Sequence, residues 1–372
     1  MNKCILITGG AGFIGSHLAD ELLVRGHHVR ILDVLSPQVH EGRQGPPDYL
    51  HSDVEFIHGD VRDTHLLHQA LCGVDAVYHF AAAVGVGQSM YELEKYMGVN
   101  TLGTAMLLEA LMARPVETLI VASSMSIYGE GLYASTDGQT YHQAERSLDQ
   151  LQAGVWELYD PQGRRLEPLA TPESKLPSLT SIYALSKYDQ ERLCLLVGRA
   201  YHIATVALRF FNVFGPRQAL SNPYTGVLAI FATRYLNGQP PLIFEDGDQR
   251  RDFVSVYDVV QACCQALDVP DAAGHVFNIG SGHAYTIRDV AEQLGHVLGK
   301  THLMPCITQT YRMGDIRHCF ADIALARSVL GYEPRVTLTE GLRQWVEWLS
   351  GQQAHDRVEH ARRELAQRGL TV

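Results

Sequence analysis

The sequence has few cysteines, no long apolar run and a deficit of positive charge. Its seven cysteines are scattered over 372 residues without a C-x-x-C pair, which indicates reduced thiols and no structural zinc site. No apolar stretch approaches the roughly 20 residues that span a bilayer, and the apolar start lacks a signal-peptide cleavage pattern. The net charge of −11 argues against wrapping a nucleic-acid backbone. We therefore expect a cytoplasmic protein with no membrane, nucleic-acid or metal partner.

The chain does contain a regular alternation of short apolar runs and amphipathic segments. We predict strands at 3–8, 28–32, 54–58, 76–80, 118–123 and 204–210, and helices at 15–25, 64–71, 99–112 and 183–202. The strands are almost continuously apolar, as expected where helices cover both faces of a sheet. This rhythm predicts an α/β fold, a Rossmann-type doubly wound parallel sheet with a smaller mixed C-terminal substrate lobe.

The domain boundaries follow from changes in this rhythm. Residues 1–210 are expected to form the Rossmann domain and residues 211–372 the smaller lobe, with 252–267 returning to the first domain. Residues 131–180 are weakly periodic, and we interpret them as an insertion that covers the active site. The polar segment 356–367 is expected to be a solvated terminal helix.

A glycine-rich turn joins the first predicted strand to the first helix. In Thr8-Gly-Gly-Ala-Gly-Phe-Ile-Gly15, Gly10 is expected to make the tight turn and Gly12 to let the backbone approach a pyrophosphate. Gly15 would allow close packing of the helix, whose N-terminus offers free N–H groups to phosphates. The residues expected to contact the dinucleotide here are Gly9, Gly12, Phe13, Ile14 and Gly15.

Acidic residues at two strand ends complete the predicted dinucleotide site. Asp33 ends the second strand, where it can accept hydrogen bonds from a ribose diol and repel a 2′-phosphate. NAD is therefore expected rather than NADP. Asp60 and Val61 follow the third strand and are expected to flank the adenine edge, although Asp60 has the alternative of capping the next helix.

A phenol and an ammonium one helical turn apart are the candidate catalytic pair. Tyr183 and Lys187 share a helix face, and beside an oxidised nicotinamide their proximity should lower the pKa of the phenol. The spacing alone is common, but Ser123 and Ser124 end a predicted strand at the edge where open α/β sheets bind ligands. A serine there can orient a substrate hydroxyl towards the phenolate.

Taken together, these motifs resemble the extended short-chain dehydrogenase/reductases of the nucleotide-sugar epimerase/dehydratase family. The resemblance spans nearly the whole chain and includes the glycine loop, Asp33, Asp60, the serine strand and the tyrosine–lysine pair. Its further motifs are His79-Phe-Ala-Ala82, Asn100, Leu208-Arg-Phe-Phe-Asn-Val-Phe-Gly-Pro216, Arg250-Arg-Asp-Phe253 and Arg312-Met-Gly-Asp315.

The resemblance implies roles for individual residues. It makes Ser124, Tyr183 and Lys187 the catalytic trio, and adds Ala81 and Asn100, with the tyrosine and lysine, to the cofactor site. It implies that a nucleotide-diphosphate sugar is bound by Ser124, Ser126, Asn212, Arg251, Arg312 and Asp315, with the last on the ribose. Relatives dimerise through the helices expected here at 99–112 and 183–202, so a homodimer is expected.

The two residues after Ser124 narrow the choice among the reactions of this family. Dehydratases resemble Asp-Glu at the positions of Met125 and Ser126. At the position of Ser126, decarboxylases carry a glutamate and 3,5-epimerases a cysteine. What remains is inversion at C4 through a transient 4-keto sugar. The insertion is similar to that of dTDP-L-rhamnose 4-epimerases, but without their cysteines, and predicts a dTDP-linked 6-deoxyhexose such as dTDP-L-rhamnose as substrate. Cys319 occupies a position where a small side chain is expected to widen the sugar pocket.

Three alternatives stay open at this point. The chain resembles UDP-glucose/galactose 4-epimerases almost as well, and no residue distinguishes the nucleobases. A nucleotide-sugar 4-ketoreductase would use the same trio and release the cofactor after each turnover. A non-enzymatic NAD-sensing binding protein is a third reading, against which the presence of both Tyr183 and Lys187 argues.

Overall fold

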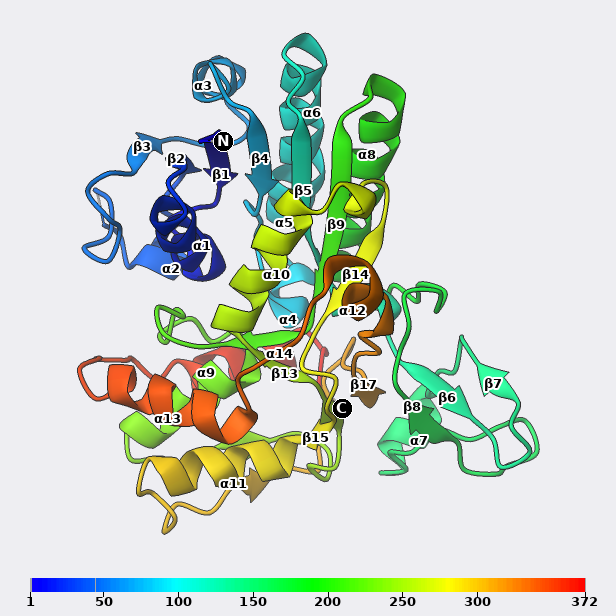
Figure 1. The fold of residues 1–372 in the computed structure, drawn as a ribbon. Helices are drawn as coiled ribbons and strands as arrows, with labels where there is room; N and C mark the ends of the chain where they lie inside the picture. Colours follow the sequence, from blue (N-terminus) through cyan, green and yellow to red (C-terminus); the bar gives the residue numbers. More distant parts are fainter. Residues whose placement is uncertain (1, 44, 372) are drawn as a thin grey trace.

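A parallel seven-stranded sheet forms the centre of the molecule (Figure 1). The computed structural model describes residues 2–43 and 45–371. The strand order is β14-β9-β5-β4-β1-β2-β3. The strands are β1 (Cys4–Thr8), β2 (His28–Asp33), β3 (Glu55–His58), β4 (Ala76–His79), β5 (Thr118–Ser124), β9 (Ala204–Phe210) and β14 (Val276–Ile279). This order and the flanking helices confirm the predicted Rossmann-type fold.

The edge strand β14 was missed in the sequence. It pairs in parallel with β9 and lies within residues 211–372, which the sequence analysis assigned to the smaller lobe. Four residues are too short for a clear strand signal, so only the pairing with β9 defines it. The chain therefore returns to the sheet once more than the sequence indicated.

Helices cover both faces of the sheet. On one face α1 (Phe13–Val24) packs against α10 (Val256–Asp268), and on the other α6 (Gly103–Ala113) lies between α3 (Thr64–Ala70) and α8 (Ile182–Tyr201). The side chains of β1 alternate between these layers: Ile5 and Ile7 join the core under α1, and Leu6 joins the opposite core. Burial on both faces explains why the strands are apolar throughout.

The smaller lobe lies beyond the carboxyl ends of the strands (Figure 1). Its core includes Trp345, Phe231 and Leu294 from three different helices. Its helices are α9 (Val227–Leu236), α11 (Ile287–Val297), α13 (Leu338–Leu349) and α14 (Val358–Gln367). Its short strands are β10 (Asn212–Phe214), β11 (Leu242–Ile243), β12 (Arg250–Arg251), β13 (Phe253–Ser255), β15 (Tyr285–Thr286), β16 (Cys306–Ile307) and β17 (His318–Cys319).

The insertion forms a small unit at the side of the molecule (Figure 1). Strands β6 (Leu132–Ala134), β7 (Thr140–Tyr141) and β8 (Glu167–Leu169) make one sheet. Helix α7 (Leu148–Gln152) lies between β7 and β8 in the chain. Its core holds only Tyr133, Leu158 and Leu166, with two partly buried neighbours. With so few apolar contacts the insertion needs other support, and buried ion pairs with the main body supply it.

Shorter elements complete the chain. A π-helix at Met97–Leu102 precedes α6, where a continuous α-helix over 99–112 was expected; such turns often occur at functional sites. The other short elements are α2 (Pro37–His40), α4 (Val86–Ser89), α5 (Leu93–Tyr96), α12 (Ala324–Leu330) and 3₁₀ turns at Met125–Tyr128 and Pro270–Ala272. Within residues 2–43 and 45–371, no helix combines the length and apolarity needed to cross a membrane.

Candidate active site

The glycine turn after β1 depends on both Gly9 and Gly10. Gly9, rather than Gly10, takes the left-handed conformation, with φ of 71°. A side chain at Gly9 would also lie 2.7 Å from the Ala81 nitrogen, and one at Gly10 would strike Ile31 on β2. Gly10 lies within the turn, as expected, and its missing side chain allows the loop to approach β2.

Gly12 and Gly15 have the surroundings that a pyrophosphate site needs. A Cβ at Gly15 would lie 2.7 Å from the Gly9 oxygen, so this glycine lets α1 press against the loop. At Gly12 the nearest atom is that same oxygen at 3.2 Å, and the other side is open. Gly12 caps α1 without any side-chain hydrogen bond, so the N–H groups of Phe13 and Ile14 face the opening. These features fit a dinucleotide diphosphate.

Asp33 at the end of β2 organises the same loop. Its carboxylate accepts hydrogen bonds from the Ala11 nitrogen at 3.0 Å and the Leu35 nitrogen at 2.8 Å. Burial raises the pKa of Asp33, and the two backbone donors oppose that rise. Two backbone bonds leave lone pairs on the carboxylate for a ribose diol, which agrees with the predicted role.

Asp60 is held by its own neighbour. Its carboxylate receives two guanidinium bonds from Arg62, at 2.9 and 2.6 Å, and this pairing lowers the pKa of Asp60. The alternative that Asp60 caps the next helix is wrong, because Asp63 caps α3. Val61 is buried against Gly103 of α6. Both predicted residues thus have structural partners beside the candidate adenine site.

Asn100 positions the chain that follows β4. Its side chain is fully buried in the π-helix; its oxygen accepts from the Ala83 nitrogen at 2.7 Å and its amide donates to the Ala83 oxygen. The same amide donates to Ser186 of α8 at 2.9 Å. Ala81 lies against the glycine turn. Asn100 therefore ties α6, α8 and the loop beside the dinucleotide site together.

Tyr183 and Ser124 meet at the carboxyl edge of the sheet. Tyr183 lies in the first turn of α8, and its phenol is within hydrogen-bonding reach of Ser124 at the end of β5. Ser124 also bonds the Ser126 hydroxyl at 2.8 Å. In the protein alone burial raises the pKa of Tyr183, and the bond with Ser124 opposes that rise. The predicted fall in this pKa thus requires positive charge from Lys187 and the dinucleotide.

Lys187 has a partner that the sequence did not reveal. Its ammonium donates to Gln190 at 2.6 Å, and the Gln190 amide lies 3.2 Å from His79, which also bonds Thr8 of β1. Burial lowers the pKa of Lys187 to about 8, and it lowers the pKa of His79 to about 3. Gln190 is neutral, so the hydrogen bond that holds Lys187 in place does not neutralise its positive charge. No motif in the sequence marks Gln190.

One cavity of about 310 Å³ joins the sheet edge to the smaller lobe. It gathers all the residues that were predicted to bind substrate, although they come from four separate segments, together with Tyr183 from a fifth. The predicted residues that line it are Ser124, Ser126, Tyr183, Asn212, Arg251, Arg312 and Asp315. A cavity between the two parts of an α/β enzyme is the usual place for a small-molecule site.

The cavity contains an arginine without an acidic hydrogen-bond partner among the described residues. Arg251 donates to the Arg250 oxygen at 2.9 Å, to the Arg317 oxygen at 2.8 Å and to the Ile316 oxygen, and burial lowers its pKa. A half-buried guanidinium held only by carbonyls is suited to an anion. Arg312, by contrast, bonds both oxygens of Asp315, so two residues predicted to bind different parts of the substrate form an ion pair.

Two expectations about the walls of this cavity are wrong, and a third holds only in part. Of the insertion 131–180, only Thr180 lines it, so the insertion does not cover the site. Cys319 is 1% exposed and is not among the lining residues. The expected terminal helix is present, but it is solvated on one face only, because its other face contributes four lining residues, Val358, Ala361, Arg362 and Leu365. The spacing of its apolar members could have revealed an amphipathic helix.

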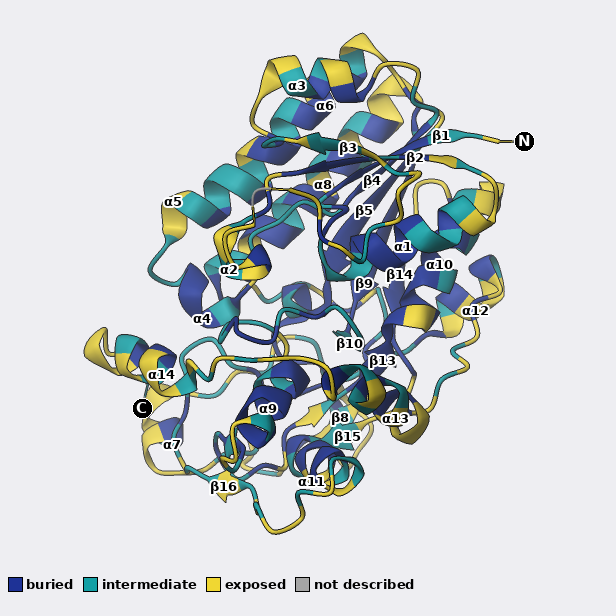
Figure 2. Cartoon of the chain, turned by 90° about the vertical axis from the view of Figure 1, so that its left-hand side faces the viewer, coloured by how far each residue is buried: buried dark blue, intermediate teal, exposed yellow. Residues whose placement is uncertain are grey.

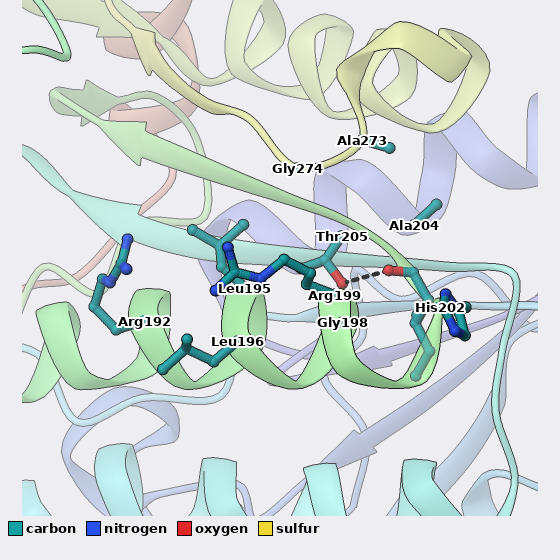
Figure 3. A pocket seen from close by; sticks show the side chains of 11 residues that line it. Arg192, Leu195, Leu196, Gly198, Arg199, His202, Ala204, Thr205, Ala273 and Gly274 are labelled. Carbon is teal, nitrogen blue, oxygen red and sulfur yellow. Dashed lines mark hydrogen bonds between the residues drawn. The ribbon is translucent and has the colours of Figure 1, made fainter.

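A second cavity, of about 510 Å³, lies at the other end of α8 (Figure 3). Arg192, Arg199 and His202 are its polar lining residues, beside Thr205. No predicted site residue is among the described residues that line it. In the described ranges, no cluster of three or more His, Cys, Asp or Glu side chains is arranged to hold a metal.

Comparisons with known proteins agree with this site. Residues 5–280 match the model of the NAD dependent epimerase/dehydratase family. The chain is 33% identical over 94% of its length to the dTDP-L-rhamnose 4-epimerase of Burkholderia thailandensis, of which it covers 95%.

Solved structures show the same likeness. A UDP-glucose 4-epimerase from Thermotoga maritima, with UDP-glucose, matches at 30% identity and a TM-score of 0.75, over 93% of this chain and 98% of that one. A UDP-glucuronic acid 4-epimerase mutant from Bacillus cereus, with NAD and a fluorinated UDP-sugar, matches at 29% and 0.76, over 93% and 99%. The chain thus belongs to the NAD-dependent epimerase/dehydratase family: it is an NAD-dependent enzyme and groups with nucleotide-sugar 4-epimerases.

Proposed function

We propose that this enzyme inverts C4 of a nucleotide-linked sugar, with a dTDP-linked 6-deoxyhexose such as dTDP-L-rhamnose as its preferred substrate. The observation that carries the proposal is the shared cavity, in which Ser124 and Tyr183 face the same space as Arg251. In this proposal residues 1–210 and 252–267 hold the dinucleotide, and residues 211–372 hold most of the nucleotide sugar.

The proton chemistry belongs to Tyr183. Its phenolate takes the proton from the sugar O4, and the same oxygen returns it once the 4-keto sugar has turned over in the cavity. Ser124, in reach of the phenol, orients the sugar hydroxyl. When bound, NAD supplies the hydride acceptor at C4 and then the donor to the opposite face. Lys187, held in place by Gln190, favours the ionised phenol when its ammonium is charged.

The residues beside Ser124 support simple epimerisation. Met125 is apolar and Ser126 is a hydroxyl donor bonded to Ser124, so neither provides a second acid and base for removing water. Loss of a carboxylate or inversion at further carbons would also need groups that these positions lack. Reversible oxidation at C4 uses only the hydroxyl, phenol and ammonium groups described above.

The substrate assignment is supported by the Burkholderia relative, which has the highest identity among those compared above, and by its coverage of nearly the whole chain. A second candidate is a UDP-hexose, favoured by the solved neighbour that contains UDP-glucose. The two substrates differ at the base methyl and at the sugar C6, so the same catalytic groups serve both.

We also propose that two copies associate through α6 and α8. Both helices pack together on one face of the sheet, and Leu185 and Leu196 of α8 are 36% and 46% exposed. Apolar side chains on an exposed helix face suit a second copy of the same chain. Light scattering should give the mass of a dimer; a monomer would contradict this part of the proposal.

The experiment that tests the function follows sugar configuration directly. Purified protein is incubated separately with dTDP-L-rhamnose, UDP-glucose and UDP-galactose, without added cofactor, and the C4 configuration is followed by proton NMR. We expect the C4 epimer of dTDP-L-rhamnose to accumulate to equilibrium, at least about tenfold faster than either UDP-sugar reacts. If no substrate changes at C4 with NAD retained, the proposed function is wrong.

A further inference from the structure

The C-terminal segment 356–371 closes one side of the substrate cavity. Helix α14 buries Ala361 and Leu365, and both line the cavity. A Cβ placed on Gly87 would lie 3.4 Å from the Leu365 side chain and 3.6 Å from that of Arg312. Figure 2 shows α14 next to α4, with buried and exposed residues alternating along it. One face of this segment is thus a wall of the site, and the other face is exposed to solvent.

Both ends of this segment are fastened to the body of the protein. At its start, buried Arg234 of α9 bonds Asp356 at 3.1 Å. At its end, the Met313 nitrogen donates to the Leu370 oxygen at 2.9 Å, and Thr371 forms a bridge with Arg312. The wall is therefore attached to the loop that carries Arg312 and Asp315, two of the predicted substrate residues.

Arg362 brings to the cavity a positive charge that is only weakly paired. Its one ion pair among the described residues is with Glu359, on the same helix, at 3.4 Å, and its side chain is 37% exposed. Glu359 lies 3.6 Å from Arg234 as well, so its charge is shared between two arginines. Long, exposed pairs of this kind contribute little, and Arg362 can leave this one for a stronger anion.

The charge balance of the cavity indicates what that anion is. Five charged side chains line it: Glu245, Arg251, Arg312, Asp315 and Arg362. Glu245 is bonded by Arg146 and Arg317, which lie outside the lining, and Asp315 is bonded by Arg312. Two guanidinium groups, on Arg251 and Arg362, are left without a full counter-charge. A nucleotide-diphosphate sugar carries two negative charges on its diphosphate.

We propose that Arg362 binds the diphosphate of the nucleotide sugar and that residues 356–371 hold it there. The planar guanidinium fork matches phosphate oxygens in both charge and geometry. This inference rests on the proposed function for the identity of the substrate. Arg362 does not take part in the proton chemistry, so its contribution falls on substrate binding and not on the chemical step.

The helix offers a matched control for the test. Arg363 is the next residue; it donates to the backbone carbonyl oxygen of Glu359 at 3.3 Å and does not line the cavity. Binding of UDP and of dTDP is measured by calorimetry on the NAD-loaded protein, for Arg362→Met and Arg363→Met. We expect Arg362→Met to weaken both by about tenfold or more and to raise KM similarly, with kcat within about threefold, as expected for a lost charge-assisted contact to phosphate. Arg363→Met should match the wild type.

A truncation tests the wall as a whole. A chain ending at His355 should bind UDP and dTDP at least as weakly as Arg362→Met and retain its NAD. If Arg362→Met stays within about twofold of Arg363→Met, the inference is wrong, whether or not the truncated chain folds. If Arg362→Met loses UDP and dTDP binding but the wild type epimerises no nucleotide sugar, the inference stands and the proposed function fails.

Discussion

The dinucleotide loop and the substrate cavity are built in contrasting ways. The loop occupies eight consecutive residues, and its close contacts are between Gly9, Gly15 and their immediate neighbours. Asp33 at the end of β2 and Ala81 just after β4 also meet it. The cavity draws its walls from segments between Val84 and Leu365, including a helix at the very end of the chain. One site is local in sequence and the other is assembled by the fold.

This contrast shows where tolerance to change should differ. The loop depends on the absence of side chains at its glycines, so a side chain added there meets neighbouring atoms. The cavity depends on charges, and these are balanced over long sequence distances by residues such as Arg317 and Glu245 that also support the insertion. Damage to the loop should therefore appear in NAD binding, and damage to the lobe in substrate binding.

The largest effect is expected at Tyr183, where the two sites meet. Tyr183→Phe removes the phenolic oxygen and should lower turnover by about 10² to 10⁴-fold, the usual contribution of general acid–base catalysis. Bound NAD and the affinity for UDP should be unchanged. Steady-state kinetics and cofactor content measure this, with Tyr188→Phe on the same helix but outside the cavity lining as control. Near-normal turnover in Tyr183→Phe would overturn the assignment of this residue.

The next effect concerns the buried charges behind the cavity. Arg317 is 1% exposed and bonds Glu157, Glu245 and Asp246. Arg317→Met removes one cationic partner from each of these carboxylates and should lower the free energy of unfolding by about 3 to 5 kcal/mol, measured in urea. It should raise the KM for substrate more than it affects NAD binding.

A surface pair provides the control for Arg317. Arg327 bonds Glu333 at 3.2 Å with both side chains more than half exposed. Arg327→Met should change the free energy of unfolding by less than about 1 kcal/mol. If the two variants are equally stable, the buried network does not hold the insertion and the lobe together.

A third prediction concerns pH and Asp252, whose backbone oxygen accepts a hydrogen bond from Asn212 in the cavity lining. Burial raises the pKa of Asp252 from 3.8 to about 6, although Ser281 and Gly282 donate to it. A raised carboxyl pKa favours the folded state at low pH, and this contribution is lost as the pH rises. Relative to Asp252→Asn, the wild type should lose about 2 to 3 kcal/mol of unfolding free energy between about pH 4 and pH 7. Urea unfolding at several pH values measures this; a gain with rising pH would contradict it.

The smallest effects separate two glycines of the loop. In Gly15→Ala the new methyl meets backbone atoms at 2.7 Å, so the free energy of unfolding should fall by about 1 to 3 kcal/mol. Gly12→Ala meets only one atom, at 3.2 Å, and should keep its stability while weakening NAD binding by about tenfold, or about 1.4 kcal/mol. Gly45→Ala, with open surroundings, is the control. Equal loss of stability in Gly12→Ala and Gly15→Ala would show that the loop is not divided in this way.

Much of the sheet could be predicted because strands buried on both faces form almost continuous apolar runs in the sequence. The run Cys4–Thr8 is apolar almost throughout, and six of the seven strands were expected within a residue or so of their observed bounds. β14 was missed because a four-residue strand gives no periodic signal. Gln190 was missed for another reason: a neutral amide acquires its role only from Lys187 and His79, which the fold places on either side of it.

By itself the sequence determined the parallel sheet, the glycine turn with its acid at the end of β2, and a tyrosine and a lysine one turn apart. Each of these is a pattern within a few residues, set by backbone sterics or by helical and strand periodicity. Only the tertiary structure decided that α14 lines the cavity, that the insertion does not, and which arginines keep uncompensated charge. Those facts depend on contacts between residues more than a hundred positions apart, and such contacts leave no regular spacing in the chain.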